Sequence, residues 1–157
     1  MAKFLNFKLE RFDKLDAYMH SMEKIEEHLT GIIKCGVYDG AAIATQAVKD
    51  AIREVTSYEA TGSLEKSVML AKMEEDMGYI FTKIVYNGYD ENDVPQVLKA
   101  RVLENGRSDQ EHRVPTHFCS KAIRKYKKKI EDAMDDTINE RCERILREIA
   151  KGEYFGR

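Results

Sequence analysis

The sequence contains few residues that interrupt regular structure. Its 157 residues include only nine glycines and two prolines, and proline in particular ends or kinks a helix. It also has only three cysteines, Cys35, Cys119 and Cys142, which are widely spaced and form no CxxC motif. That spacing argues against a disulfide scaffold and favours a reducing compartment. We therefore expect long regular elements and three unpaired thiols that bind no metal.

Long apolar runs and an excess of one charge are also missing. The longest uncharged apolar stretch, around GAAIATQAV, is far too short to span a bilayer. The N-terminal sequence MAKFLNFKLERF has no continuous apolar core, so we expect no signal peptide. The net charge of -2 gives no global reason to expect nucleic acid or an anionic membrane as a partner.

The composition is that of a soluble globular protein with a strongly charged surface, because 43% of the residues are hydrophobic and 34% are charged. A chain of this length can bury one core. We predict a single domain over residues 1–157, with residues 152–157 as a flexible tail.

The first third of the chain is predicted to be mostly helical. Apolar and small residues recur at three- and four-residue steps over about residues 23–55, which is the period of one helix face. Gly36 and Gly40 belong to this pattern, where they either let a neighbouring element approach closely or mark a kink. Residues 11–22 predict a separate short helix. Residues 3–12 alternate enough to predict a short edge strand, with helix onset as the alternative.

The period of the apolar residues changes from about 3.6 to 2 after Thr61-Gly62, which has the chemistry of a turn. We predict two antiparallel strands at about residues 64–73 and 78–87, joined by the connection EDMG. The fold class is therefore α+β. A small antiparallel sheet, formed by the hairpin and the N-terminal edge strand, is expected to pack against long helices.

Two further helices are expected after the hairpin. Asp93 near the cap and Pro95 in the first turn mark the start of a short helix, and Gly106 marks its end. The last helix is predicted over about residues 116–151, where apolar residues mark one face. It would be roughly 50 Å long, so we expect its end to project or to pack on another subunit.

Three residues that are close in sequence, His112, His117 and Cys119, are candidates for chemistry. A structural zinc site needs four ligands, and no second cluster has matching spacing. A cysteine nucleophile would need a base within hydrogen-bond reach and an orienting group, which closeness in sequence does not provide. Motifs such as GxGxxG, HExxH and GxSxG are absent. We therefore favour polar loop histidines and a half-buried cysteine, and expect no catalytic residue, metal or cofactor.

The segment KAIRKYKKK, residues 121–129, carries six positive charges and no acid. A small nucleic-acid-binding regulator could use such a patch. However, the acidic segment EDAMDD follows immediately, and Lys127 and Lys128 each lie four residues before an acid, as in ion pairs along a helix. We favour a solvated, salt-bridged helix face, with contact to an acidic protein surface or to DNA as the alternative.

Four segments occur in an order that resembles a known family. They are TGSLEKSV at residues 61–68, the hairpin, VLKARVLENGRS at residues 97–108, and VPTHFCSKAI at residues 114–123. This order is similar to that of the tail-completion, or neck, proteins of long-tailed bacteriophages and prophage tail-like particles. Those proteins have a Thr-Gly-x-Leu-x-x-Ser turn into a strand, an apolar helix ending in Glu-aromatic-Gly-Thr-Ser, and a Pro-Phe entry into a C-terminal helix. Here Asn105 replaces the aromatic residue and Arg107 replaces the threonine.

The resemblance implies an adaptor that works by assembly. Such a protein would form a ring, a hexamer by resemblance, beside tail-tube or tail-terminator proteins and connector or collar proteins, with non-specific passage of DNA through the ring. It would assemble in the host cytoplasm and end in a virion or tail-like particle, without contact to a membrane. Residues 104–118 would be a structural joint and subunit-contact loop. The expected contact residues are Glu104, Gly106, Arg107, Ser108, Asp109, Glu111 and Arg113, and the expected joint residues are Gly106, Pro115 and Phe118.

Overall fold

The structure, a computed structural model, describes residues 2–56, 62–106 and 114–150. The elements are α1 (Ala2–Val55), α2 (Ser63–Ser67), β1 (Val68–Leu70), β2 (Glu74–Asp76), β3 (Tyr79–Phe81), β4 (Ile84–Tyr86), α3 (Gln96–Asn105) and α4 (Phe118–Ala150). Two small antiparallel sheets pack with long helices, so the predicted α+β class with a long C-terminal helix is confirmed. The predicted tail, residues 152–157, lies outside the described residues.

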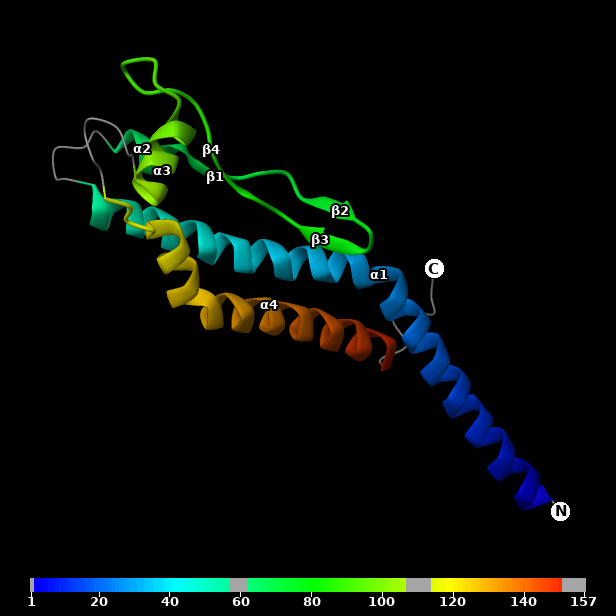
Figure 1. Cartoon of the computed structure of the whole chain (residues 1–157). Coiled ribbons are helices and arrows are strands. Elements are labelled where there is room, and N and C mark those ends of the chain that lie inside the picture. The colour runs from blue at the N-terminus through cyan, green and yellow to red at the C-terminus, as the bar shows by residue number, and fades with distance from the viewer. Residues whose placement is uncertain (1, 57–61, 107–113, 151–157) are drawn as a thin grey trace.

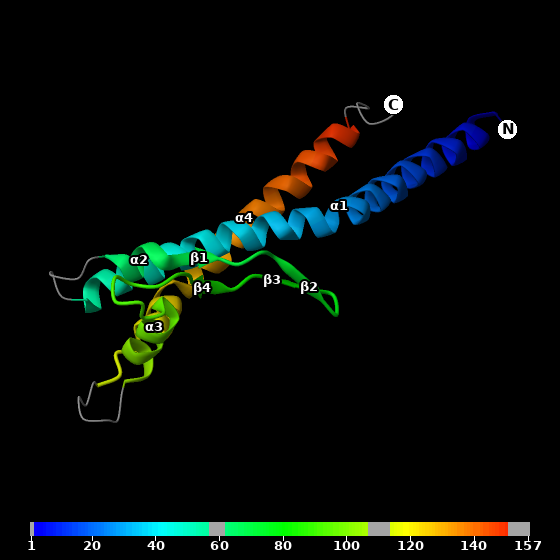
Figure 2. The same ribbon diagram turned by 90° about the horizontal axis from the view of Figure 1, so that it is seen from above.

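Helix α1 is the central layer of the molecule. Figure 1 shows α4 on one side of α1, and the hairpin of β1 to β4 together with α3 on the other side. In both Figure 1 and Figure 2 the N-terminal part of α1 extends beyond the end of α4. The hairpin and α4 therefore pack on different faces of α1, and α3 connects the two layers at one end.

Helix α1 is continuous from Ala2 to Val55, so the predicted edge strand at residues 3–12 and the separate helix at residues 11–22 are wrong. The apolar residues of the first segment also recur at four- and three-residue steps, which fits a helix. The first 30 residues contain neither glycine nor proline. Helix propagation adds one hydrogen bond for each residue that is fixed, so nothing in this segment stops it once a nucleus exists.

The predicted hairpin is present, but as two short ladders. β1 and β4 pair in the register Val68↔Tyr86, Met69↔Val85 and Leu70↔Ile84, and β2 and β3 pair in the register Glu74↔Phe81, Glu75↔Ile80 and Asp76↔Tyr79. Three residues, 71–73, separate β1 from β2, whereas only two, 82–83, separate β3 from β4. The extra residue on the first strand is a β-bulge, which divides the hairpin into its two ladders.

The tip of the hairpin is the two-residue turn Met77-Gly78, within the connection predicted from the sequence. Both residues have positive φ angles, 47° and 81°, as in a type I′ turn, whose twist matches that of the flanking strands. Glycine adopts this conformation without strain, whereas other residues do so less readily. Met77 is 91% exposed and Tyr79 is 75% exposed, so the tip presents two large side chains to solvent.

One turn of helix, α2, replaces the beginning of the predicted strand at residues 64–73. Gly62 precedes this turn with a φ of 67°, in the left-handed region that glycine favours. Leu64 and Ser67 are both buried, and the Ser67 hydroxyl donates a hydrogen bond of 2.6 Å to the Leu64 carbonyl. Residues three positions apart share a face in a helix but point to opposite faces in a strand. The helical turn therefore allows both residues to be buried.

Asp90 organises the loop that precedes α3, whereas Asp93, which was predicted near the helix cap, lies two positions before the cap residue Pro95. One carboxylate oxygen of Asp90 accepts hydrogen bonds from two backbone N–H groups of the same loop, at 2.9 and 2.8 Å, and the other pairs with Lys99 of α3. Lys99 and these N–H groups hold the pKa of Asp90 below its usual value. Asp93 has a φ of 59°, and Pro95 precedes the helix instead of lying in its first turn.

The core lies at the end of the molecule where α1, α2, β1, α3 and α4 meet. Its buried residues are Val48, Ile52, Leu64, Val68, Ala100 and Phe118. Phe118 is the first residue of α4 and is only 2% exposed. The first turn of α4 is therefore attached to the core, whereas the rest of α4 extends along α1 (Figure 1).

Gly36 and Gly40 lie where α4 packs directly against the backbone of α1, and the helix is unbroken at both positions. A Cβ atom on Gly36 would lie 2.8 Å from Cγ1 of Ile138 and 3.1 Å from the carbonyl oxygen of Met134. A Cβ atom on Gly40 would lie 2.5 Å from Cγ of Met134. Both glycines therefore provide the close approach, and not the kink, that the sequence left open.

Alanine substitutions at the three glycines of α1 should change stability in different directions, depending on whether α4 contacts the glycine. A Cβ atom on Gly31 meets nothing within 4 Å, so Gly31→Ala should raise the free energy of unfolding by up to about 1 kcal/mol through better helix propensity. Gly36→Ala should lower it by about 1–3 kcal/mol, because α4 must move away. Urea unfolding of both variants and the wild type measures the difference.

Gly40→Ala provides a second arm of this test, because the atom it meets belongs to the flexible side chain of Met134. Met134→Ala combined with Gly40→Ala should recover much of any loss caused by Gly40→Ala alone. Equal stability of Gly31→Ala and Gly36→Ala would show that the two helices are not in close contact at Gly36.

Candidate contact site at the junction of helices α3 and α4

The end of α3 is hydrogen-bonded to the residues that lead into α4. The Thr116 N–H and hydroxyl both donate to the Leu103 carbonyl, at 3.0 and 2.6 Å, and the His117 N–H donates to the Glu104 carbonyl at 3.1 Å. The last carbonyls of a helix have no partner within that helix. The chain that returns to the junction therefore completes the C-terminus of α3.

The same junction completes the N-terminus of α4. The Glu104 carboxylate accepts hydrogen bonds from the N–H groups of Cys119, at 2.8 Å, and Ser120, at 3.2 Å, and also from the Ser120 hydroxyl. A helix N-terminus favours a negative charge because its first N–H groups are unpaired and its dipole is positive there. Glu104 thus takes the capping role that a serine, threonine, aspartate or asparagine usually fills.

The pKa of Glu104 reflects this capping role. Partial burial alone would raise the pKa, but the hydrogen bonds from Ser120 and Cys119, together with the nearby His117, hold it below its usual value. The carboxylate is therefore ionised at neutral pH. Although the sequence predicted Glu104 as a subunit-contact residue, both of its carboxylate oxygens are bonded within the chain.

Gly106 and Pro115 flank the segment that connects the two helices. Gly106 follows the last residue of α3 with a φ of 74° and a ψ of −177°, and its N–H donates to the Val102 carbonyl at 2.9 Å. This combination of angles is essentially restricted to glycine. Val114 and Pro115 are exposed, so the residues that lead into α4 lie at the molecular surface.

The other predicted contact residues fall within the connecting segment, residues 107–113, which lies outside the described residues. They are Arg107, Ser108, Asp109, Glu111 and Arg113, and the candidate histidine His112 lies among them. Both flanks of the segment belong to the hydrogen-bonded junction. The segment therefore leaves and re-enters the described structure at one place.

Cys119 lies half-buried in the junction, with its thiol beside the Tyr86 hydroxyl of β4. Burial and the negative charge of Glu104 raise the pKa of Cys119, against an opposing effect of Tyr86. A raised pKa keeps the sulfur in its thiol form, which is the weaker nucleophile. In the part of the chain that the structure describes, no three His, Cys, Asp or Glu side chains are grouped so that they could hold a metal ion.

An open groove of about 340 Å³ lies beside the junction, between α1 and the first turns of α4. Small and apolar residues of both helices contribute to its lining, together with acids of α1 and lysines of α4, namely Asp50, Glu54, Lys121 and Lys125. Small-molecule sites are usually enclosed and mostly apolar, with a few converging polar groups. The groove is open and carries four charged side chains, so its lining does not mark it as a small-ligand site.

The charged face predicted on the last helix is present on α4. The six basic residues within residues 121–129, called here the basic segment, and the four acids within residues 131–136, called here the acidic segment, are all exposed. Lys127 forms the expected pair with Glu131 at 3.6 Å. Lys128 and Asp132 form no ion pair among the described residues, so the face is solvated but only partly salt-bridged.

Ser120 is a junction residue that the sequence analysis missed. Its N–H and hydroxyl both donate to Glu104. A signal for this arrangement does exist in the sequence, because His117 occupies the position directly before α4. Since no usual capping residue stands there, the helix needs an acceptor from elsewhere in the chain, and Glu104 closes the preceding helix.

In the described residues, none of the helices combines the length and the apolar character that a bilayer crossing requires. Comparisons with known protein families, with curated proteins and with solved structures found no match. The resemblance to phage tail-completion proteins therefore rests on short segments of the sequence alone.

Glu104→Gln should destabilise the protein near neutral pH by about 1 kcal/mol, as expected for a weakened helix cap. Because the folded pKa of Glu104 lies below the ordinary glutamate value of about 4.3, its contribution is fully present above that value. The contribution is lost as the pH falls through the lowered pKa. Urea unfolding at about pH 7 and about pH 3 should therefore show the difference between variant and wild type shrinking in acid.

Glu91→Gln is the matched control for this experiment. Glu91 is an exposed residue of the loop before α3 and has no hydrogen bond among the described residues, so the same loss of charge should barely change stability. A Glu104→Gln variant that matches this control at both pH values would show that Glu104 does not cap α4.

Proposed function

We propose that this protein is a structural adaptor of a phage or phage-tail-like particle, and that it forms a ring at the head-proximal end of the tail. One observation carries the proposal. The three segments of the resemblance that lie outside the hairpin meet in a single core, to which they contribute Leu64 and Val68, Ala100, and Phe118 respectively.

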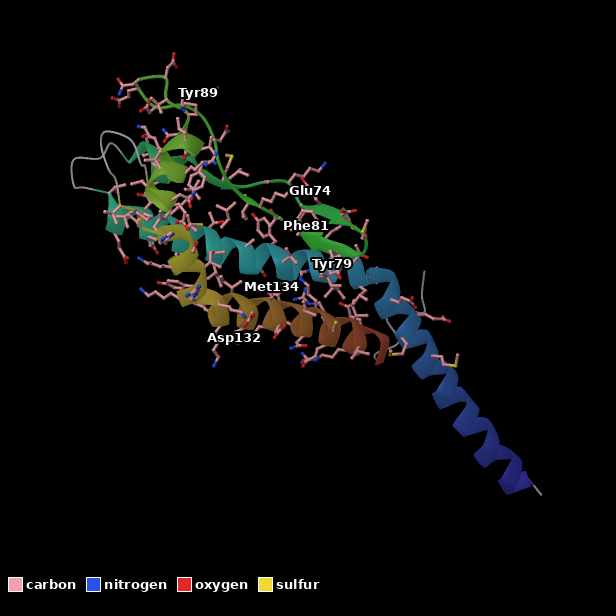
Figure 3. All side chains as sticks on the ribbon, viewed as in Figure 1. Glu74, Tyr79, Phe81, Tyr89, Asp132 and Met134 are labelled. Carbon is pink, nitrogen blue, oxygen red and sulfur yellow. The ribbon has the colours of Figure 1, made fainter. Side chains whose placement is uncertain are left out.

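A ring needs two complementary surfaces on every copy, because a head-to-tail contact that closes by rotation joins different patches of neighbouring copies. The hairpin is one candidate surface. Each ladder has two strands, so its outer edges have no strand partner among the described residues. Figure 3 shows Tyr79 near the exposed end of this hairpin and Glu74 on the neighbouring strand. Two large side chains at this end, Met77 and Tyr79, are exposed and therefore accessible to another protein.

The junction of α3 and α4 is a second candidate surface. Its internal hydrogen bonds fix both flanks of residues 107–113, and that segment is rich in charged residues. The resemblance supplies the expected neighbours: identical copies in a ring of six, a tail-tube or tail-terminator protein on one side, and a connector or collar protein on the other. DNA would pass through such a ring without sequence-specific contacts.

A small nucleic-acid-binding regulator is the alternative. The exposure of all six basic residues within residues 121–129 favours it, because lysine and arginine bind phosphates and release counterions. The acidic segment begins two residues further along the same helix and would repel the same phosphates. The adaptor remains the better-supported function, and DNA binding that weakens steeply with salt would favour the regulator.

Native mass spectrometry and negative-stain electron microscopy of the purified chain should show a closed ring with a central channel. Particles produced without this protein should be defective at the head-proximal end of the tail. Tails without heads would indicate a joining role, and tails of abnormal length would indicate a terminating role. Normal, infectious or active particles in the absence of the protein would refute the proposed function.

Two substitutions separate subunit contact from folding. Arg107→Glu should change the free energy of unfolding by no more than about 0.5 kcal/mol, as surface substitutions usually do, yet weaken assembly by reversing a predicted contact charge. Phe118→Ala should lower the free energy of unfolding by about 3–5 kcal/mol, because the side chain is buried. Thermal melting and incorporation into particles measure both effects. Normal incorporation of Arg107→Glu would remove Arg107 from the predicted contact.

A further inference from the structure

The charges on the exposed side of α4 are segregated along the helix. The basic segment contains six positive charges and no acid, and the acidic segment contains four negative charges and no base. All ten side chains are exposed. Figure 3 shows Met134 on the side of α4 that faces α1 and Asp132 on the side that faces away. The Asp132 side of α4 is thus separate from the surface that packs within the chain, whereas Lys121 and Lys125 lie at the edge of that surface, where they line the groove beside α1.

Five of these residues form a continuous stripe. They recur at steps of four and three residues, which keeps them on one side of a helix: Lys121, Lys125, Lys128, Asp132 and Asp135. At a rise of 1.5 Å per residue the stripe is roughly 21 Å long. We call this set the α4 stripe, with a basic half of three lysines and an acidic half of two aspartates.

Ion pairs within the chain do not account for this arrangement. Among the described residues, no member of the α4 stripe forms an ion pair, although Lys128 and Asp132 have the spacing to do so. The basic half also begins close to the N-terminus of α4, where the helix dipole disfavours positive charge. A surface shaped only by helix stability would place acids there and alternate the two signs further along.

We infer that the α4 stripe is a contact between copies of this chain, in which the basic half of one stripe faces the acidic half of a neighbour's stripe. A second copy fits because it carries both charges in the required order. Nucleic acid would match the basic half alone and would be repelled by the acidic half. An unrelated protein would have to carry the same segregation of charge in a complementary order.

This contact rests on the proposed function only in requiring that the chain associates with itself. In a ring, each copy would use its basic half toward one neighbour and its acidic half toward the other, which is a head-to-tail contact. Exposed charges of this kind set the orientation and the selectivity of association more than its strength. The association should therefore weaken as salt screens the charges.

Charge reversal tests this contact. The basic-reversed variant is Lys121→Glu with Lys125→Glu and Lys128→Glu, and the acid-reversed variant is Asp132→Lys with Asp135→Lys. Each should associate with itself at least about tenfold more weakly than the wild type, because like charges then face each other. A mixture of the two variants should associate again. Sedimentation velocity over a range of concentrations, at low and high salt, measures all of these states.

A chain that carries both sets of reversals gives the sharpest result. Its stripe is again self-complementary but in the opposite order, so it should associate with itself and exclude the wild type. The matched control is Lys66→Glu with Arg101→Glu and Arg141→Glu, which reverses three exposed positive charges outside the α4 stripe and outside the hairpin. This control should associate as the wild type does. Thermal melting of every variant establishes that it is folded.

Several results would overturn the inference: a wild type that is monomeric at all concentrations, reversed variants that associate normally, or a control that weakens association equally. Loss of DNA binding in the basic-reversed variant with unchanged self-association would overturn it in favour of a nucleic-acid site. A different result would refute the proposed function while leaving this contact intact. If the charge pattern governs association but particles form normally without the protein, the contact stands and the adaptor role does not.

Discussion

The close contact between α1 and α4 determines where the rest of the chain can lie. Gly36 and Gly40 let Met134 and Ile138 reach the backbone of α1, and this fixes the line that α4 follows. Thr137 adds a hydrogen bond of 2.7 Å to Asp39 across the same contact. With one face of α1 covered by α4, the hairpin and α3 occupy the opposite side (Figure 1). The same contact turns the charged side of α4 outward.

The parts of the fold that local chemistry determines were predictable from the sequence. The Met77-Gly78 turn, the helical period of α4 and the glycine after α3 each depend on residues within the same short segment of the chain. Predictions failed where the deciding partner was distant. The helical form of residues 3–12 follows from an uninterrupted α1, and the helical turn of α2 follows from the burial of Leu64 in a core built by other elements. Likewise, a bulge that shifts the register by one residue cannot be predicted from one strand, because it depends on how the two strands pair.

In the candidate site, too, the features that depend on local sequence were predictable and those that depend on distant partners were not. The sequence marked residues 104–118 as a joint because glycine and proline punctuate it, and the structure does bond α3 to α4 there. The resemblance also named Glu104 as a subunit-contact residue. Its carboxylate caps α4, and this role could be foreseen only by asking which acceptor replaces the missing cap beside His117. Spacing along one chain does not reveal that two helix ends will meet.

The position of the core at one end has a consequence for how the molecule opens. Regions open locally at a free-energy cost set by the buried contacts they make. Amide groups near Val48 and Ile52, which are almost fully buried, would exchange their hydrogens only when the whole chain unfolds. Amides at the hairpin tip, whose β2 side chains are all exposed, would exchange through small openings. A partner bound at that tip would slow exchange there by stabilising the closed state, while exchange near the core would still report global unfolding.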